Sequence, residues 1–180
     1  QTIDVLYLKQ NGLAEALMAG QLIGEEINNA RNLSNTPGSD MTPQVLANEA
    51  MEVGRKWGVK VNVLDENAMT ELKMGGILGV GKGSSERPKF IIMEYLKGPR
   101  GEKPVVLVGK GVTFDTGGLN LKPDNSIYEM HMDMSGGSAV IHAIAALARL
   151  KVKKNIVGLV PAVENMPSGS SYHPGDVLTT

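Results

Sequence analysis

Lys110, Asp115, Lys122 and Asp133 lie within one glycine-broken stretch of this 180-residue chain. Carboxylates are hard oxygen donors that suit divalent cations, and a lysine can stabilise negative charge that develops on an oxygen. Two carboxylates alone are weak evidence for a metal site, because most aspartates are solvated or cap helices. The alternative is a set of Asp–Lys ion pairs at the rim of a loop, and the spacing leaves both interpretations open.

The backbone around the two lysines is unusual. Lys110 directly follows the short apolar run 105–108 and has glycine on both sides, so its backbone can enter a tight space. An ammonium group has no lone pair, so Lys110 could bind a metal only as the neutral amine, a form that a neighbouring dication would favour. Lys122 precedes Pro123, which biases it to an extended conformation. There it could present its charge to an oxyanion, or it could be a solvated lysine of a loop.

Apolar periodicity and capping residues predict the elements that position this stretch. The predicted helices span residues 13–33, 43–57, 66–74 and 135–150, and the predicted strands span residues 59–64, 89–95, 104–109 and 155–160. Residues 1–9 are interpreted as a strand or as the tail of a preceding domain. Thr42 and Pro43 are a helix start signal, Gly58 is a stop signal, and Asp65 can cap the third helix.

Helices that alternate with strands indicate an α/β protein with a mixed sheet. The strands at 89–95 and 104–109 are expected to pair as an antiparallel hairpin. The stretch with the lysines and aspartates would then lie in loops beyond the carboxyl ends of strands, where open α/β sheets bind their ligands.

A second glycine-rich segment, residues 76–84, nearly matches the phosphate-binding pattern G-x-x-x-x-G-K-[ST]. The residue after Lys82 is Gly83, so the hydroxyl that should bind magnesium is displaced. The segment before it is predicted to be a helix, whereas a phosphate-binding loop follows a strand. We therefore interpret the segment as an ordinary loop.

The composition excludes several kinds of protein. The chain has no cysteine, which rules out disulfides and thiolate chemistry, and its net charge of −1 argues against nucleic acid as a partner. No apolar run approaches the roughly 20 residues that span a bilayer, so no membrane partner is expected. The three histidines, His131, His142 and His173, are expected to be structural rather than ligands. The ten methionines are expected to fill the core, with Met130 as a candidate pocket residue.

The motif VGKGVTFDTGGLNLKP at residues 108–123 closely resembles the leucyl aminopeptidase (cytosol aminopeptidase) family of dinuclear metallopeptidases. So do MHMDM at 130–134, ENMPSG at 164–169 with PGD at 174–176, and the upstream segments 30–38 and 41–43. The resemblance covers the chain from about Gly20 onward. It implies a three-layer αβα fold with a mixed central sheet, as part of the catalytic domain of a leucyl aminopeptidase.

The resemblance also implies roles for individual residues. Lys110 would bind a metal through its neutral amine, Asp115 would bridge two metals, and Asp133 would bind the same metal as Lys110. Lys122 would be catalytic, contacting the substrate and stabilising the tetrahedral intermediate, and Met130 would line the pocket for the first side chain of the peptide. The implied reaction is release of apolar, leucine-like amino-terminal residues by a two-metal-activated water. The implied cofactors are two divalent ions, manganese or zinc with cobalt or magnesium as alternatives, and bicarbonate as a base.

The chain departs from the family pattern at its ends. Family members have further ligands in an Asp-x-Glu-x-Arg segment, whose arginine helps to hold the bicarbonate, and this sequence stops at Thr180 without one. It also begins with Gln1, and His131 stands where lysine is common. We therefore expect a piece of a longer protein: residues 1–32 as a linker helix with the tail of an amino-terminal domain, and residues 33–180 as the first part of the catalytic domain. Alone, these residues are expected to be inactive.

For the full-length parent, the resemblance implies a cytoplasmic homo-hexamer that acts on peptides. Some members of the family also bind DNA. The alternative hypothesis is therefore a non-catalytic scaffold or DNA-binding module on the same fold, although the near-neutral charge gives it little support.

Overall fold

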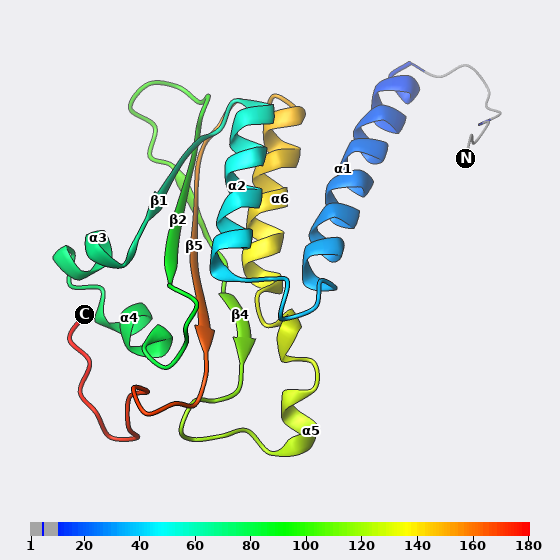
Figure 1. Cartoon of the computed structure of the whole chain (residues 1–180). Coiled ribbons are helices and arrows are strands. Elements are labelled where there is room, and N and C mark those ends of the chain that lie inside the picture. Colours follow the sequence, from blue (N-terminus) through cyan, green and yellow to red (C-terminus); the bar gives the residue numbers. More distant parts are fainter. Residues whose placement is uncertain (1–4, 6–10) are drawn as a thin grey trace.

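Five strands form one mixed sheet, and helices cover both of its faces (Figure 1). This computed structural model describes residue 5 and residues 11–180; apart from Val5, the strand or tail predicted at 1–9 lies outside the described residues. The strands are β1 (Lys60–Leu64), β2 (Lys89–Leu96), β3 (Val105–Val108), β4 (Gly111–Asp115) and β5 (Asn155–Asn165). The helices are α1 (Leu13–Ser34), α2 (Pro43–Trp57), α3 (Glu66–Glu71), α4 (Gly75–Gly81), α5 (Asp124–Ile127) and α6 (Ser135–Arg149), with a 3₁₀ turn η1 (Met130–Met132).

The longest strand, β5, lies in the middle of the sheet. On one side it pairs antiparallel with β2, which pairs antiparallel with β1. On the other side β3 and β4 run parallel to β5 one after the other, so they behave as a single strand broken at Gly109-Lys110. Helix α6 makes the crossover between β4 and β5 that parallel neighbours require. Asp115 and Asn165 are paired residues and end β4 and β5 at the same edge of the sheet.

The antiparallel hairpin predicted between residues 89–95 and 104–109 is wrong. β5 lies between the two strands, antiparallel to β2 and parallel to β3. The apolar run of β5 is buried at alternate positions along its length, and the central place in the sheet is the one that covers it on both faces. Local turn signals could not reveal this, because the strand that separates the pair is distant in the sequence.

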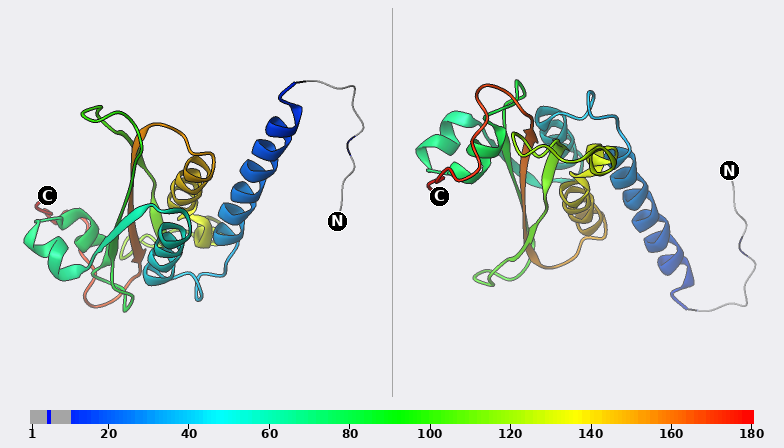
Figure 2. Two further views of the ribbon diagram at one scale, coloured as in Figure 1. Left: turned by 90° about the horizontal axis from the view of Figure 1, so that it is seen from above. Right: turned by 90° about the horizontal axis from the view of Figure 1, so that it is seen from below.

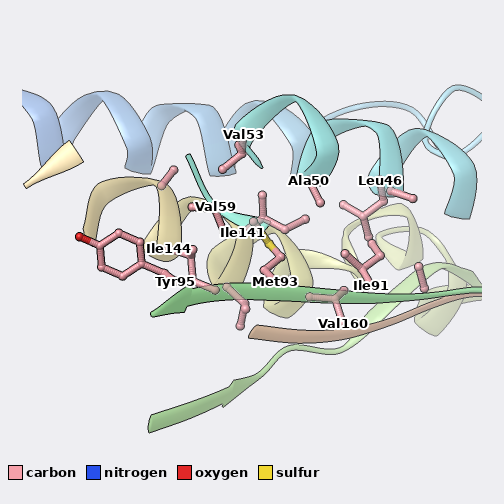
Figure 3. Packing of buried hydrophobic residues seen from close by; sticks show 14 of the residues in the cluster. Leu46, Ala50, Val53, Val59, Ile91, Met93, Tyr95, Ile141, Ile144 and Val160 are labelled. Carbon is pink, nitrogen blue, oxygen red and sulfur yellow. The ribbon is translucent and has the colours of Figure 1, made fainter. Parts of the chain in front are cut away.

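The helices form layers on the two faces of the sheet, which confirms the predicted α/β class with helices on both sides. Figure 2 shows α2 and α6 on one face and α3 and α4 on the other, with α1 lying outside α6. The main core lies between α2, α6 and the sheet (Figure 3). Its labelled side chains are Leu46, Ala50, Val53, Val59, Ile91, Met93, Tyr95, Ile141, Ile144 and Val160. Within the described part of the chain, no helix is both long enough and apolar enough to cross a membrane.

Local signals set the ends of α2. The side chain of Thr42 accepts a hydrogen bond from the Val45 amide at 3.2 Å, Pro43 is the first helical residue, and Gly58 ends the helix with a φ of 68°. Asp65 caps α3 by accepting from the Ala68 amide at 2.9 Å. These predictions are confirmed, although α3 ends at Glu71 rather than at the predicted residue 74.

The prediction of a loop for the glycine-rich segment is wrong, because Gly75–Gly81 forms α4. Glycine is a poor helix former, but here the chain that follows β5 returns against the helix (Figure 1). A Cβ at Gly75 would lie 2.0 Å from the carbonyl oxygen of Thr179, and one at Gly79 would lie 2.6 Å from Leu178. Close packing therefore requires glycine on this helix. Lys82 follows a helix and not a strand. This agrees with the argument from the sequence against a phosphate-binding loop.

β4 and β5 differ most from the sequence predictions, whereas the other strands match them to within one residue at each end. β4 was predicted as a loop, and β5 continues to Asn165 instead of stopping at residue 160. The longer strand includes Pro161, and proline has no N–H for the ladder. The paired register passes from Leu159 opposite β3 to Ala162 opposite β4, so Pro161 faces the break between the two strands. The missing N–H is tolerated there.

Candidate metal site at the strand ends

Lys110 lies where β3 breaks before β4, against the start of α6. The amide of Gly137 donates to the carbonyl oxygen of Lys110 at 2.7 Å. A Cβ on Gly109 would lie 2.3 Å from the carbonyl oxygen of Gly136, so only glycine fits beside Lys110 on that side. The predicted tight space around Lys110 is thus confirmed, and the close contact brings Lys110 next to Asp133, two residues before α6.

Lys110 and Asp133 form an ion pair. Lys110 Nζ lies 2.8 Å from Asp133 Oδ2, and the side chains are 57% and 18% exposed respectively. Asp133 Oδ2 is buried and, although Lys110 lies beside it, it forms no hydrogen bond among the described residues. A buried carboxylate oxygen without a hydrogen bond lowers the stability of the fold. Asp133 Oδ2 can still accept a hydrogen bond or bind a cation.

Asp115 and Lys122 form a second ion pair, at the end of β4. The chain turns back after Asp115 through Gly117 and Gly118, whose φ values of 88° and 70° favour glycine. The Lys122 amide donates to the carbonyl oxygen of Thr116 at 2.8 Å, which closes the turn. Lys122 Nζ then lies 3.2 Å from Asp115 Oδ2. Asp115 was predicted in a loop and is instead the last residue of a strand.

The carboxylate of Asp115 is held in its ionised form. Burial alone would raise its pKa, but hydrogen bonds from the Gly117 amide and the Asn165 side chain, together with Lys122, hold the pKa below its usual value. Asn165 Nδ2 donates to Asp115 Oδ1 at 2.7 Å. The sequence interpretation assigned no role to Asn165. Its place in the segment ENMPSG is the signal that could have drawn attention to it.

The structure brings the four charged candidates together in two pairs. In the described ranges, no ion pair links the Lys110–Asp133 pair with the Lys122–Asp115 pair. Met130 is half-buried in η1, which packs against β4. His131 is in the same turn and His173 is exposed in the loop after β5.

His142 belongs to a separate group of charges between α1 and α6, which we name the interhelical cluster: Glu25, Glu26, His142 and Arg149. His142 Nδ1 lies 2.8 Å from Glu26 Oε2, Arg149 contacts Glu26 Oε1, and Arg149 also lies 2.7 Å from Glu25. Burial would raise the pKa of Glu26, but its bonds to His142, Arg149 and Asn29 lower it below its usual value.

The donors at the strand ends suit a hard divalent cation, because they combine two carboxylates with an amine and include a buried oxygen that lacks a hydrogen bond. Over residues 5 and 11–180, no three His, Cys, Asp or Glu side chains gather as a metal site by themselves. A metal held here would therefore need the amine of Lys110 as well as the two aspartates. The alternative interpretation, a set of Asp–Lys ion pairs at the rim of a loop, predicts the same two ion pairs.

Comparisons with known proteins agree on one family. Residues 28–180 match the cytosol aminopeptidase family, catalytic domain. A probable cytosol aminopeptidase of Chlorobaculum parvum is 48% identical over 90% of this chain, and one of Geobacter sulfurreducens is 45% identical over 93%. These alignments cover 32% and 34% of the two relatives, so the chain spans about a third of their length.

Solved structures share the fold. The bottromycin maturation enzyme BotP, in complex with Mn, superposes with a TM-score of 0.86 at 37% identity, over 94% of this chain and 36% of BotP. A leucine aminopeptidase of Caenorhabditis elegans gives a TM-score of 0.84 at 30% identity, over 88% of this chain and 32% of that one. With the family match across residues 28–180, these likenesses show that the chain belongs to the cytosol aminopeptidase family, within its catalytic domain.

Proposed function

We propose that this protein is a metal-dependent aminopeptidase that releases leucine-like residues from the amino terminus of peptides. The observation that carries the proposal is the placement of two Lys–Asp pairs along one line of strands, in a chain of the cytosol aminopeptidase family: one pair at the break between β3 and β4, the other at the end of β4. The family and its relatives are named as aminopeptidases, which supports the coarser part of the proposal.

Lys110, Asp115 and Asp133 are the proposed metal ligands in this chain. Two divalent ions, when bound, would supply a Lewis acid for the scissile carbonyl and an activated water as nucleophile. The buried Oδ2 of Asp133, which has Lys110 beside it but forms no hydrogen bond among the described residues, and the ionised carboxylate of Asp115 support this assignment. BotP has been solved with Mn, which supports manganese, while zinc, cobalt and magnesium remain alternatives.

Lys122 is the proposed catalytic residue. Its side chain is 30% exposed and is held beside Asp115, so its charge is kept near the proposed metal ligands instead of moving freely in solvent. From there it can contact the substrate and stabilise negative charge on the carbonyl oxygen, an effect that is largest when water is excluded. Met130, in the turn against β4, is the proposed contact for the first side chain of the peptide.

The finer organisation is proposed from the family resemblance. Residues 1–32 would be a linker helix with the tail of another domain, and residues 33–180 the first part of the catalytic domain; α1 runs through this boundary without a break. The full-length protein would act in the cytoplasm as a homo-hexamer and use bicarbonate as a base. The 180 residues alone would have little activity, because they hold only three of the ligands that the resemblance implies.

The test is hydrolysis of leucine amide by the protein at its natural length, with added manganese, cobalt or zinc. Lys110→Ala or Asp115→Ala should lower kcat/KM by more than about 100-fold, since even residues behind the ligands typically cost 10–100-fold. The matched control is Lys154→Ala, because Lys154 is 58% exposed and forms a 2.9 Å ion pair with Glu102 away from the strand ends. Its activity should be unchanged.

Full activity of Lys110→Ala would contradict the assignment of the metal ligands. Absence of turnover by the natural-length protein with all three metals would favour the alternative of a scaffold or DNA-binding module. Substantial turnover by residues 1–180 alone would contradict the proposal that further ligands are needed.

A further inference from the structure

Asn165 donates a hydrogen bond to one oxygen of the Asp115 carboxylate. Its Nδ2 donates to Asp115 Oδ1 at 2.7 Å, and the Gly117 amide donates to the same oxygen at 2.9 Å. A carboxylate oxygen has two lone pairs, so these two donors occupy Oδ1. Asp115 Oδ2 makes none of the hydrogen bonds that hold Oδ1 and faces Lys122 Nζ at 3.2 Å. The two oxygens of one carboxylate are therefore in different states, one fixed by the protein and one open toward the candidate site.

The surroundings of Asn165 fix the direction of its amide. Asn165 is 9% exposed, and its backbone carbonyl accepts from both the hydroxyl and the amide of Thr116, at 2.8 and 3.0 Å. A Cβ on Gly118 would lie 3.0 Å from Asn165 Oδ1, so the glycine leaves room for the amide oxygen. Flipping the amide would place its oxygen against the ionised Asp115, which is repulsive, so the donor must face the carboxylate.

We propose that Asn165 is a positioning residue for the metal site, which holds Asp115 with Oδ2 presented to the bound cation. This inference rests on the proposed function, because it assumes that Asp115 is a ligand. Residues that orient ligands typically change metal affinity or activity by 10–100-fold when they are replaced. Asn165 acts through Asp115 and is not itself placed against the substrate.

A matched pair of asparagines on one strand makes the test specific. Asn155 begins β5 and donates from Nδ2 to the carbonyls of Pro99 and Glu102, at 3.1 and 2.9 Å. Its Oδ1 also accepts from the Gly98 amide at 2.9 Å, so Asn155 makes three side-chain hydrogen bonds at the other end of β5. Asn155→Ala should destabilise the fold without touching the site, whereas Asn165→Ala should affect the site as well.

The experiment measures Mn²⁺ affinity by electron paramagnetic resonance of the free ion, on the natural-length protein and its variants. Unfolding in urea with a chelator reports stability separately. Asn165→Ala should weaken Mn²⁺ binding about tenfold or more, and Asn155→Ala should leave it within about twofold. If Asn165→Ala does not fold, Asn165→Ser, whose hydroxyl is too short to reach Asp115, is used with the same expectation. The activity at saturating Mn²⁺ should recover partly in these variants.

The outcomes separate the inference from the proposed function. If wild type binds Mn²⁺ and Asp115→Ala does not, but Asn165→Ala binds as wild type does, the positioning role is overturned while the proposed function stands. If wild type fails to bind Mn²⁺, both fall together. If Asn155→Ala weakens binding as much as Asn165→Ala, the effect is general destabilisation and the inference is also overturned.

Discussion

The interhelical cluster and the strand-end site both combine carboxylates with cations, but they differ in how fully the carboxylate oxygens are paired. In the interhelical cluster, Glu26 is 4% exposed and each of its oxygens contacts a partner, His142 or Arg149. In the second site, Asp133 Oδ2 and Asp115 Oδ2 each have a lysine beside them, at 2.8 and 3.2 Å, but Asp133 Oδ2 is buried and forms no hydrogen bond among the described residues. In the interhelical cluster, both oxygens of Glu26 have hydrogen-bond partners within the protein, whereas Asp133 Oδ2 at the second site has none among the described residues.

This difference separates a charge group that stabilises the fold from one that suits a ligand. Arg149 joins α6 to α1 through Glu25 and Glu26 and lies 4.7 Å from the ring of Trp57 in α2, so the interhelical cluster ties three helices together. A buried acceptor without a hydrogen bond costs stability, and proteins retain such strain at functional sites. The separation is incomplete, because His142 Nε2 is also buried without a hydrogen bond, 3.8 Å from Glu49.

Removing one carboxylate from each group tests the comparison most directly. Glu26→Ala should lower the free energy of unfolding by about 3 kcal/mol, because it leaves Arg149 and His142 without their buried partner. Asp133→Ala should lower it by less than about 1 kcal/mol, because the ion pair that it removes joins Asp133 to a lysine that is 57% exposed and can be hydrated instead. Urea unfolding with a chelator present measures both. Glu25→Ala is the control, since Glu25 pairs with Arg149 from an exposed position and should matter far less than Glu26. Equal losses for Glu26→Ala and Asp133→Ala would show that the two groups serve the same purpose.

Gly109→Ala should disturb both the fold and the strand-end site. The added Cβ would meet the carbonyl oxygen of Gly136 at 2.3 Å, and forcing them apart should cost about 2 kcal/mol, as overpacking typically does. The shift would also separate Lys110 from Asp133 and weaken Mn²⁺ binding. Gly20→Ala on α1 is the control, because no atom lies within 4 Å of its new Cβ. It should leave metal binding unchanged and stabilise the helix by up to about 1 kcal/mol. Unchanged Mn²⁺ affinity in Gly109→Ala would refute the link between this packing and the site.

The smallest effect is expected in the free energy of unfolding at acid pH. The pKa of Glu26 is lowered in the folded state from an ordinary value of 4.5, so the unfolded chain takes up the proton first as the pH falls. Its contribution is therefore complete above about pH 4.5 and disappears as the pH falls through the lower folded pKa. The difference in unfolding free energy between wild type and Glu26→Gln, measured in urea at several pH values, should shrink below pH 4.5. A difference that stays constant down to pH 3 would show that Glu26 contributes through shape rather than charge.

Much of the local structure could be predicted because its causes are local. Thr42, Pro43 and Gly58 mark the ends of α2 through capping and backbone preferences that involve only their neighbours. The glycines around Lys110 predicted a tight backbone, and the contact with Gly136 confirms it. The candidate ligands were found for a similar reason, since Lys110, Asp115 and Asp133 lie in motifs that can be recognised along the chain.

The partners of these residues could not be predicted in the same way. Asn165 is 50 positions from Asp115 in the sequence, and it becomes a neighbour only because β5 pairs with β4. The helix at Gly75–Gly81 was missed because its glycines are explained by Leu178 and Thr179, which approach from the far end of the chain. His142 was predicted to be structural, and its contact with Glu26 on α1 gave no sequence signal.

By itself, the sequence determined the α/β class, the positions of most helices and strands, and the residue types from which a metal site could be built. The tertiary structure alone decided that β5 enters between β2 and β3, that Asp115 ends a strand beside Asn165, and which lysine pairs with which aspartate. The physical reason is that helix ends and tight turns depend on a few adjacent residues. Strand order and the direction of a buried carboxylate depend instead on burying the apolar faces of the whole sheet at once.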